Sequence, residues 1–211
     1  MAIDFTTTQR YEFGSSVLSA YPFTFAAWVY PDTLTANRTI IDIGSTSNPD
    51  GHRIFLTTAG IVTANTLLNN SGYVASSTTG ATTGIWQHAC GVFAAANDRR
   101  AYLNGGNKGT GSTSAVFDSA VINRTTIAAQ LRSGSYTQGM DGRIAEAAIW
   151  NAALSDDEVY SLSRGIKPTL IRPDNLIFYM PLVRNAFEYI EARGFTTTGS
   201  PTITDHPKRY G

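Results

Sequence analysis

Carboxylate side chains are the residues of this chain with the clearest potential for chemistry, because hydrolysis of a glycosidic bond uses two of them. A retaining mechanism needs an acid and a nucleophile about 5 to 5.5 Å apart, which two acids alternating along one strand would provide. Glu146 is the only acid between Gly142 and Trp150, and its expected same-face neighbours are Ile144 and Ala148. We therefore expect Glu146 to make a local hydrogen bond or ion pair and not to catalyse.

The remaining titratable residues do not form a catalytic pattern either. Glu188 and Glu191 are three residues apart, which favours a solvated helical turn over a glycosidase pair. No Gly-x-Ser-x-Gly motif occurs, and the three histidines, His52, His88 and His206, have no triad motif or zinc-ligand spacing around them. The sequence thus predicts a protein that is not an enzyme and has no catalytic residues.

One segment combines a histidine with the single cysteine. His88 and Cys90 alternate with Trp86 and Val92, which predicts that they face inward from a strand. We interpret His88 as a hydrogen-bonded core histidine and Cys90 as a small buried thiol, since a lone cysteine cannot form an internal disulfide.

Calcium is the one cofactor for which candidate ligands exist. Asp50, Asp98 and Asp141 lie in expected loops, but their neighbours are mostly amides and hydroxyls, whereas calcium takes six to eight oxygens, usually including several carboxylates. We expect each aspartate to form an Asx-type turn, and any calcium binding at these loops to be weak. The sequence leaves the metal and ligand residues unassigned.

The composition limits the class of partner. The chain has 211 residues, with 16 Lys+Arg against 16 Asp+Glu, so no overall field would draw it to nucleic acid or to an anionic membrane. Charged residues are only 15% while hydrophobic residues reach 42%, so Thr, Ser, Asn and Gly must supply much of the polar surface. This composition suits strands and turns in one folded domain.

Turn residues divide the chain into short strands, as in a sandwich or barrel. Expected strands cover residues 21–30, 38–43, 52–58, 60–68, 72–76, 85–93, 99–103, 125–131, 142–150 and 175–180. Trp28, Trp86 and Trp150 fall at strand positions, where each would bury a large apolar area. The Gly/Ser/Thr-rich stretch 107–114 is expected to be a mobile surface loop.

Only one segment carries strong helix signals. Ser155 and Glu158 have the spacing of a capping box, Val159 and Leu162 form an apolar stripe, and Gly165 can take the left-handed conformation that ends a helix. A short helix of about two to three turns should begin near Ser155.

Three blocks occur in an order that resembles a known family: Phe23-Thr-Phe-Ala-Ala-Trp-Val29, then Trp86 to Gly105, then Met140 to Glu158. Together they resemble the laminin-G-like branch of the concanavalin A-like lectin/glucanase superfamily, over about residues 1–166. The resemblance implies an all-β fold, a jelly-roll β-sandwich of two antiparallel sheets with one short helix, in which one sheet is concave.

The two ends of the chain carry separate expectations. The N-terminus does not resemble a secretory signal peptide, and the longest apolar run, Phe25–Tyr30, is too short to span a bilayer. We assign residues 1–195 to the sandwich and residues 196–211 to an extended, Thr- and Pro-rich tail. The tail is interpreted either as an arm that gains order on a neighbouring molecule or as a strand or frayed end on its own domain.

Two functional hypotheses follow. In the first, the protein is a lectin that is not part of a particle, with Tyr11, Tyr73 and Tyr136 among the residues that stack on sugars. In the second, which we favour, it is a non-catalytic phage virion protein, a capsid decoration or adhesin on the virion surface with a capacity for glycan binding. Virion assembly inside the cell would reconcile a laminin-G-like fold with an N-terminus lacking a secretion signal. Its partners would be virion proteins or copies of itself, as in a trimer, with cell-surface glycan as a ligand.

Overall fold

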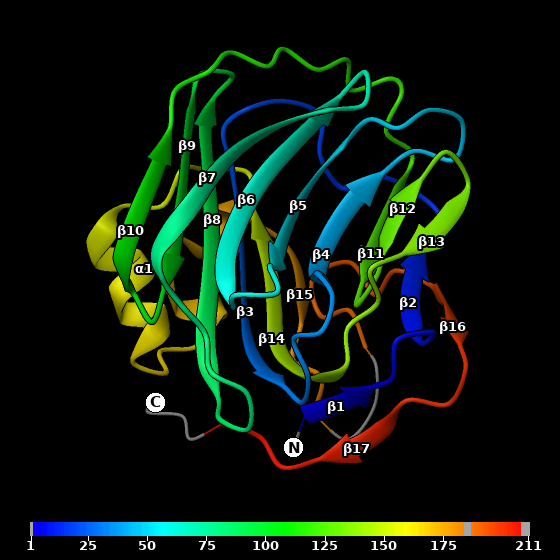
Figure 1. Ribbon diagram of the computed structural model, residues 1–211, viewed down its shortest axis with the longest axis vertical. Helices are drawn as coiled ribbons and strands as arrows, with labels where there is room; N and C mark the ends of the chain where they lie inside the picture. The colour runs from blue at the N-terminus through cyan, green and yellow to red at the C-terminus, as the bar shows by residue number, and fades with distance from the viewer. Residues whose placement is uncertain (1, 184–186, 208–211) are drawn as a thin grey trace.

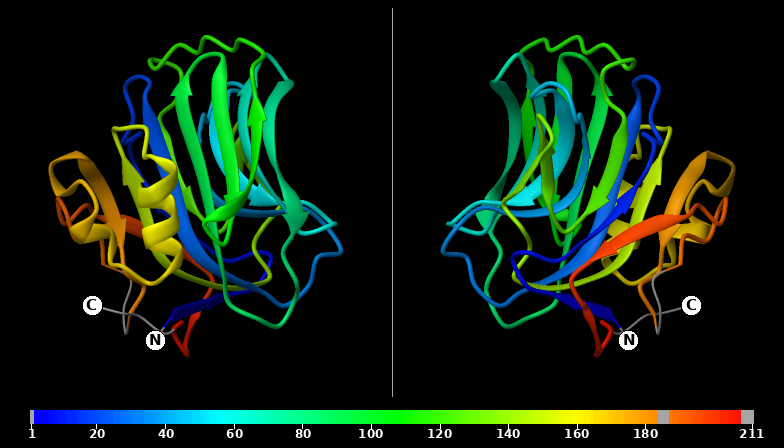
Figure 2. Two further views of the ribbon diagram at one scale, coloured as in Figure 1. Left: turned by 90° about the vertical axis from the view of Figure 1, so that its left-hand side faces the viewer. Right: turned by 90° about the vertical axis from the view of Figure 1, so that its right-hand side faces the viewer.

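Antiparallel strands in two large sheets make up most of the protein, as a computed structural model describes it over residues 2–183 and 187–207. The first sheet has the order β10 (Gly106–Gly111), β9 (Asp98–Leu103), β8 (Gln87–Ala95), β3 (Phe23–Pro31), β14 (Gly142–Trp150), β1 (Ala2–Phe5) and β17 (Thr202–Thr204), and β15 (Leu176–Met180) also pairs with β14. The second sheet has the order β16 (Phe195–Thr198), β2 (Arg10–Phe13), β11 (Arg124–Ile127), β4 (Arg38–Gly44), β5 (Gly51–Leu56), β6 (Ile61–Leu68) and β7 (Ser71–Gly80). The sheets lie face to face (Figures 1 and 2), which confirms the expected jelly-roll β-sandwich.

Alternation along the strands builds the core between the sheets. In β3, Phe23, Phe25, Ala27 and Val29 point into the core, while the intervening residues, Trp28 among them, point outward. This period of two is the pattern of a strand with one face on the core. A chain of aromatic contacts, including a stacked pair of Phe23 and Phe93 with ring centroids 4.6 Å apart, fills this interior.

The one α-helix among the described residues, α1 (Asp156–Ser163), packs against the outer face of the first sheet (Figure 2). The capping box is confirmed: the Glu158 N–H donates to Ser155 Oγ at 3.3 Å and the Ser155 N–H donates to Glu158 Oε2 at 2.7 Å. Val159 and Leu162 are buried in a second apolar cluster that also contains Trp150 and Cys90. Two short 3₁₀ helices follow, η1 (Pro168–Leu170) and η2 (Pro173–Asn175).

The three tryptophans do not share one environment. Trp150 is fully buried, and its indole N–H donates to the Ile171 carbonyl oxygen at 2.7 Å. Trp28 and Trp86 are half-buried, and Trp86 precedes β8 instead of lying in it. Trp150 therefore confirms the expectation of a tryptophan with a large buried area in a strand. The expected placement of Trp86 in a strand is wrong.

The segment expected to be a mobile loop, residues 107–114, largely forms strand β10, so that expectation is wrong. β10 pairs with β9 and also crosses closely over β7 of the other sheet. A Cβ at Gly109 would lie 1.6 Å from the Ser76 carbonyl oxygen, and one at Gly111 would lie 2.1 Å from that of Val74. The glycines are thus needed for close backbone approach and do not indicate mobility.

Gly109→Ala should therefore destabilise the protein by about 3 kcal/mol, because the added methyl collides with backbone that cannot rotate away. Gly106→Ala is the matched control in the same strand, since no atom lies within 4 Å of its added Cβ. That control should leave stability unchanged or raise it by up to about 1 kcal/mol. Urea unfolding of both variants checks this, and equal effects of the two would contradict the close-approach interpretation.

The expected strand at 125–131 is interrupted, because Ala128 adopts a left-handed φ of 74°. The chain then folds into a hairpin of β12 (Gln130–Arg132) and β13 (Ser135–Thr137), which the sequence did not indicate.

The segment beyond residue 194 lies on the domain's own sheets. β16 pairs with β2, and β17 pairs with β1 at the bottom of the molecule in Figure 1. Of the two interpretations of the tail, the described part corresponds to strands packed on their own domain. Residues 208–211, the end of the predicted arm, lie outside the described residues.

Candidate functional site

Glu146 lies at a β-bulge in β14 and is 4% exposed. Its φ is 53°, so the backbone departs from the strand alternation, and Ile144 and Ala148 lie in different apolar clusters on opposite faces of the sheet. The Glu146 carboxylate accepts a short hydrogen bond from the Tyr179 hydroxyl and pairs with His206 Nε2 at 2.9 Å. The expected hydrogen bond or ion pair is confirmed by the hydrogen bond from Tyr179, whereas the expected same-face neighbours are wrong.

Glu188 does not lie in a solvated helical turn, so that expectation is wrong. Its side chain is fully buried and accepts hydrogen bonds from the backbone N–H groups of Tyr179, Ile190, Glu191 and Arg193. Burial alone would raise the pKa of Glu188, but these donors outweigh it and the pKa is lowered. Glu191 is exposed and pairs with Arg193 at 2.8 Å, so the two acids do not form a catalytic pair.

The three histidines lie in different environments. His52 is fully buried among aromatic rings, and its Nδ1 lies 3.1 Å from Thr66 Oγ1. Burial lowers the pKa of both His52 and His88 to about 3. His88 is buried as expected, but its Nδ1 has no hydrogen-bond partner among the described residues, so the prediction of a hydrogen-bonded histidine is wrong at that atom. Cys90 is fully buried, which confirms the expected buried thiol, and burial raises the pKa of that thiol.

The three aspartates considered for calcium are all engaged by protein groups. Asp50 Oδ1 accepts from the Asn69 N–H at 2.6 Å, Asp98 pairs with Arg100, and Asp141 accepts from the Thr33 hydroxyl at 2.6 Å. Within residues 2–183 and 187–207, no group of three or more His, Cys, Asp or Glu side chains could hold a metal ion. None of these contacts is an Asx turn, so that expectation is wrong, and Asp98 lies at the start of β9 and not in a loop.

The tyrosines proposed to stack on sugars are not gathered on one surface. Tyr11 is buried in the core between Phe5 and Phe195, so a stacking role for it is wrong. Tyr136, on the β12–β13 hairpin, is covered by Arg10, whose guanidinium carbon lies 3.5 Å from the ring centroid. Tyr73 is half-buried on β7.

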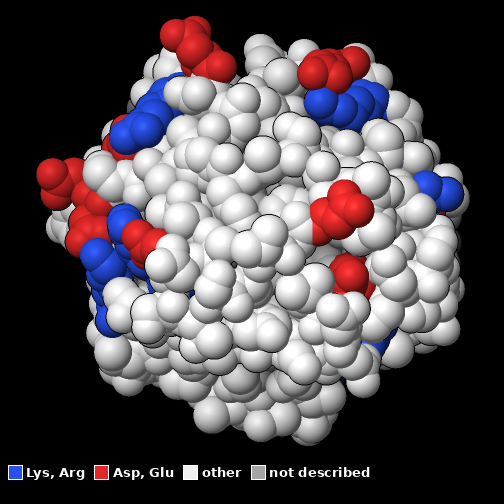
Figure 3. All heavy atoms as spheres, turned by 90° about the horizontal axis from the view of Figure 1, so that it is seen from above, with Lys and Arg blue, Asp and Glu red and all other residues white. Residues whose placement is uncertain are grey.

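A cavity of about 440 Å³ lies between the segment after β2 and the segment before β11, and we call it the rim pocket. Its volume falls in the usual range for small-molecule sites. Its polar lining consists of Ser15, Ser16, Ser19, Ser119, Asn123 and Arg124, and Leu18 and Ile122 contribute apolar surface. Figure 3 shows the molecule from above, the end where these connecting segments cross, and uncharged atoms make up most of that face.

The protein holds the Arg124 guanidinium in place at this pocket. Arg124 Nε donates to Glu12 at 3.2 Å, and its Nη1 donates to the carbonyl oxygens of Gly14 and Asn123 at 3.3 and 2.8 Å. These bonds fix the guanidinium plane and leave Nη2 to donate elsewhere. No sequence motif indicated this pocket, although the serines of Gly14-Ser15-Ser16 were a local sign of a polar loop.

A second polar surface crosses the outer face of the second sheet. Cross-strand pairing places Glu12, Thr126, Asp42, Arg53 and Asn65 in one row. Arg53 Nε and Asn65 Oδ1 have no hydrogen-bond partner among the described residues. These atoms are buried, so the row is less accessible to a ligand than the rim pocket.

Asp42 is the buried acid of this row. It is 2% exposed, and one carboxylate oxygen accepts from the Leu131 N–H at 3.0 Å. Burial raises the pKa of Asp42 to about 7, against the opposing effect of that hydrogen bond and of Arg53. Burial thus favours the protonated form of this acid more than in an ordinary aspartate.

No helix in the described part of the chain is long and apolar enough to cross a membrane.

Comparison with known proteins identifies a family for most of the chain. A family model described as the concanavalin A-like lectin/glucanases superfamily matches residues 5–160. No curated protein matches the chain.

Solved structures share the fold at low sequence identity. A native heptameric SAP-like pentraxin from Limulus polyphemus is 15% identical, with a TM-score of 0.66 over 95% of this chain and 92% of that chain. The CBM40 of the Ruminococcus gnavus IT-sialidase, bound to α2,3-sialyllactose, is 16% identical, with a TM-score of 0.67 over 77% of this chain and 96% of that chain. A leech intramolecular trans-sialidase is 16% identical, with a TM-score of 0.62 over 77% of this chain but only 28% of that chain.

Proposed function

This chain belongs to the concanavalin A-like lectin/glucanase superfamily, and from that premise we propose that it is a non-catalytic module that binds glycan in the rim pocket. The observation that carries the proposal is the lining of that pocket by hydroxyl, amide and guanidinium groups. A module of the same fold, the CBM40 of Ruminococcus gnavus, is described as bound to sialyllactose, which supports a sugar as the ligand class.

The lining of the rim pocket suits the hydroxyl groups of a sugar. A serine hydroxyl both donates and accepts, as a sugar hydroxyl does, and the pocket has four serines, of which Ser16 is already bonded to the backbone of Leu18. Arg124 adds a donor whose plane is fixed before the ligand arrives, so less conformational entropy is lost on binding. Leu18 and Ile122 supply an apolar surface for the C–H groups of the ring.

Absence of catalysis is part of the proposal. Glu146 is buried and engaged by Tyr179 and His206, and Glu188 is buried among backbone N–H groups, so neither carboxylate faces a substrate site. We expect purified protein to leave oligosaccharides intact, as followed by chromatography. Hydrolysis that disappears in Glu146→Gln would contradict this part.

A glycan array probed with purified protein, followed by calorimetry on the best glycan, tests the binding site. Ser19→Trp should fill the pocket and weaken binding by at least about tenfold, because Ser19 is exposed and lines the cavity. Ser71→Trp is the matched control, since Ser71 is also exposed but lies outside the pocket. Binding unaffected by Ser19→Trp, or absent for every glycan, would contradict the proposal.

A narrower part of the proposal is display on a phage virion, as a capsid decoration or adhesin that associates with copies of itself or with other virion proteins. The low charge and the Thr- and Gly-rich surface support it. Mass spectrometry of purified particles, with analytical ultracentrifugation of the isolated protein, tests it. A monomer absent from particles that binds a soluble oligosaccharide tightly would favour the alternative, a lectin with no particle.

A further inference from the structure

A second cavity, of about 400 Å³, lies away from the rim pocket, and its lining comes from the η1 region, from the end of β15 and from the loop that follows. Its lining residues are Lys167, Thr169, Tyr179, Pro181, Val183 and Tyr189. We call residues 187–193 the clamp loop and this cavity the clamp pocket. None of its residues lines the rim pocket.

The clamp loop is held in one conformation by a buried carboxylate. Glu188 accepts from the N–H groups of Ile190 and Glu191 within the loop, both at 2.9 Å, and from that of Tyr179 on β15 at 3.1 Å. The Tyr189 N–H donates in turn to the Tyr179 carbonyl oxygen at 2.7 Å. The loop is therefore tied to β15 on both sides of its turn.

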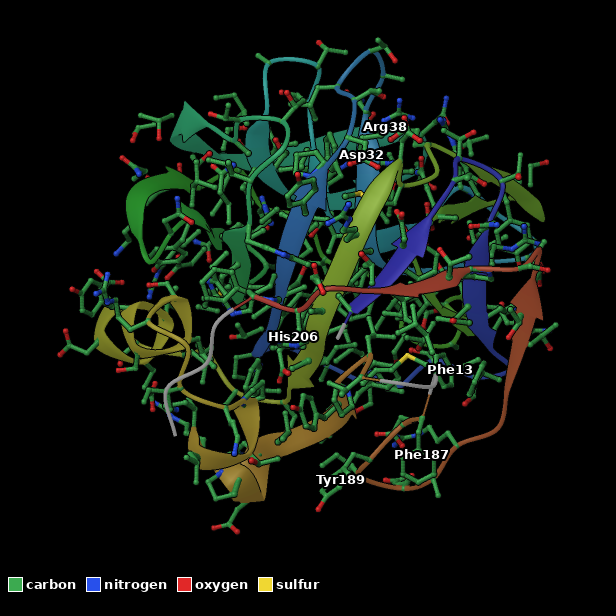
Figure 4. All side chains as sticks on the ribbon, turned by 90° about the horizontal axis from the view of Figure 1, so that it is seen from below. Phe13, Asp32, Arg38, Phe187, Tyr189 and His206 are labelled. Carbon is green, nitrogen blue, oxygen red and sulfur yellow. The ribbon has the colours of Figure 1, made fainter. Side chains whose placement is uncertain are left out.

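This fixed loop presents aromatic side chains to solvent. Tyr189 is 61% exposed and Phe187 is 48% exposed, and Figure 4 shows both on the loop that follows β15. The Tyr189 ring stands edge-on to the Tyr179 ring, with centroids 6.0 Å apart. Exposed aromatic residues grouped beside a cavity are typical of ligand sites, because leaving them in water has an unfavourable free energy.

The charge that the described residues bring to the clamp pocket is positive. Among the described lining residues Lys167 is the only charged one, and no described residue pairs with it or accepts a hydrogen bond from it. The acids of the clamp loop are already engaged, since Glu188 and Glu191 both pair with Arg193. The pocket thus favours an anionic group on its ligand.

We propose that the clamp pocket is a second sugar-binding site, specific for a sugar residue that carries a carboxylate. The apolar face of the ring stacks on Tyr189, the carboxylate pairs with Lys167 Nζ, and the Thr169 hydroxyl bonds a ring hydroxyl. This inference extends the proposed glycan binding to a separate site with its own ligand class.

Titration with D-glucuronic acid and with D-glucose tests the inference, because the two sugars differ only in the carboxylate at C6. In ¹H–¹⁵N NMR spectra of the full chain, we expect glucuronate to shift the amide signals of Thr169 and Tyr189. Glucose should bind at least about fivefold more weakly, as should glucuronate to Lys167→Gln. Tyr189→Ala should weaken glucuronate binding by about tenfold while its melting temperature stays unchanged, since the side chain is largely exposed.

Control variants separate this site from the rim pocket. Tyr160→Ala removes a comparably exposed tyrosine on α1, 55% exposed, and should leave glucuronate binding unchanged. Ser19→Trp should also leave it unchanged, although it blocks the rim pocket. Equal affinity for glucose and glucuronate, no effect of Lys167→Gln, or no glucuronate shifts at the clamp pocket would each overturn the inference.

Discussion

Acidification from pH 7 to pH 4 should lower the free energy of unfolding by about 3 kcal/mol or more, because the loss from two buried histidines outweighs the gain from Asp42 and the lowered pKa of Glu188 adds to the loss. His52 and His88 are neutral in the folded state, with pKa values near 3, but take up protons below about pH 6.5 when unfolded. Their stabilising contribution is therefore complete above pH 6.5 and is lost as the pH falls toward 3. Between pH 6.5 and 4 the two together lose about 7 kcal/mol.

Asp42 acts in the opposite direction. Its folded-state pKa of about 7 is raised above the ordinary aspartate value of 3.8, so its contribution is complete below pH 3.8 and is lost as the pH rises toward 7. On acidification Asp42 thus raises the free energy of unfolding by about 4 kcal/mol, which partly offsets the loss caused by the histidines. Asp42→Asn removes this offset, because an amide does not titrate yet can still accept from the Leu131 N–H.

Urea unfolding at pH 7 and pH 4 measures both effects. The wild-type protein should lose about 3 kcal/mol and Asp42→Asn about 7 kcal/mol over this range. A wild-type protein at least as stable at pH 4 as at pH 7 would contradict buried neutral histidines. Equal losses in the two proteins would contradict a raised pKa for Asp42.

Removal of residues 195–211 should destabilise the sandwich by about 5 kcal/mol. If these residues were instead an arm that contacts only a neighbouring molecule, their removal would leave the stability of the sandwich unchanged. The deletion removes β16 and β17 from the edges of both sheets. It uncovers Tyr11 and Phe13, whose rings lie 5.2 and 5.5 Å from that of Phe195. It also removes His206, whose Nε2 lies 2.9 Å from the carboxylate of the buried Glu146.

Thermal unfolding of the truncated protein should show a melting temperature about 10 to 20 °C lower than that of the full chain. His206→Gln isolates the contact to Glu146 and should cost about 1 to 2 kcal/mol, because an amide can still donate there. Ile203→Thr, at a residue 51% exposed on β17, is the control and should change stability by less than about 0.5 kcal/mol. A truncated protein that melts within about 2 °C of the full chain would favour the arm interpretation.

Features set by neighbouring residues were predictable from the sequence. Strand alternation in Phe23–Val29, the turn between β8 and β9 and the capping box at Ser155 all depend on contacts within a few residues or on a simple period. The order of the three blocks added the family and thus the sandwich. Burial of Cys90 followed from its place in an alternating strand.

The candidate sites were not predictable in the same way, because residues distant in sequence form them. The rim pocket joins residues near 15 to residues near 123, and one of its hydrogen bonds links Thr125 to Ser15 across 110 positions. The clamp pocket likewise needs the η1 region beside Tyr189.

The sequence by itself therefore determined the class of fold, the helix and the lack of a paired catalytic strand, since short-range periodicity and capping are local properties. The tertiary structure alone decided which polar groups are buried and what they pair with. Glu146 meets His206 because a bulge interrupts β14 at Glu146 and the segment that follows β17 passes over it. Glu188 is buried because its loop folds its own N–H groups around the carboxylate. Gly109 is needed because the backbone of β7 lies against it. That contact joins residues distant in sequence, so no local sequence pattern could indicate it.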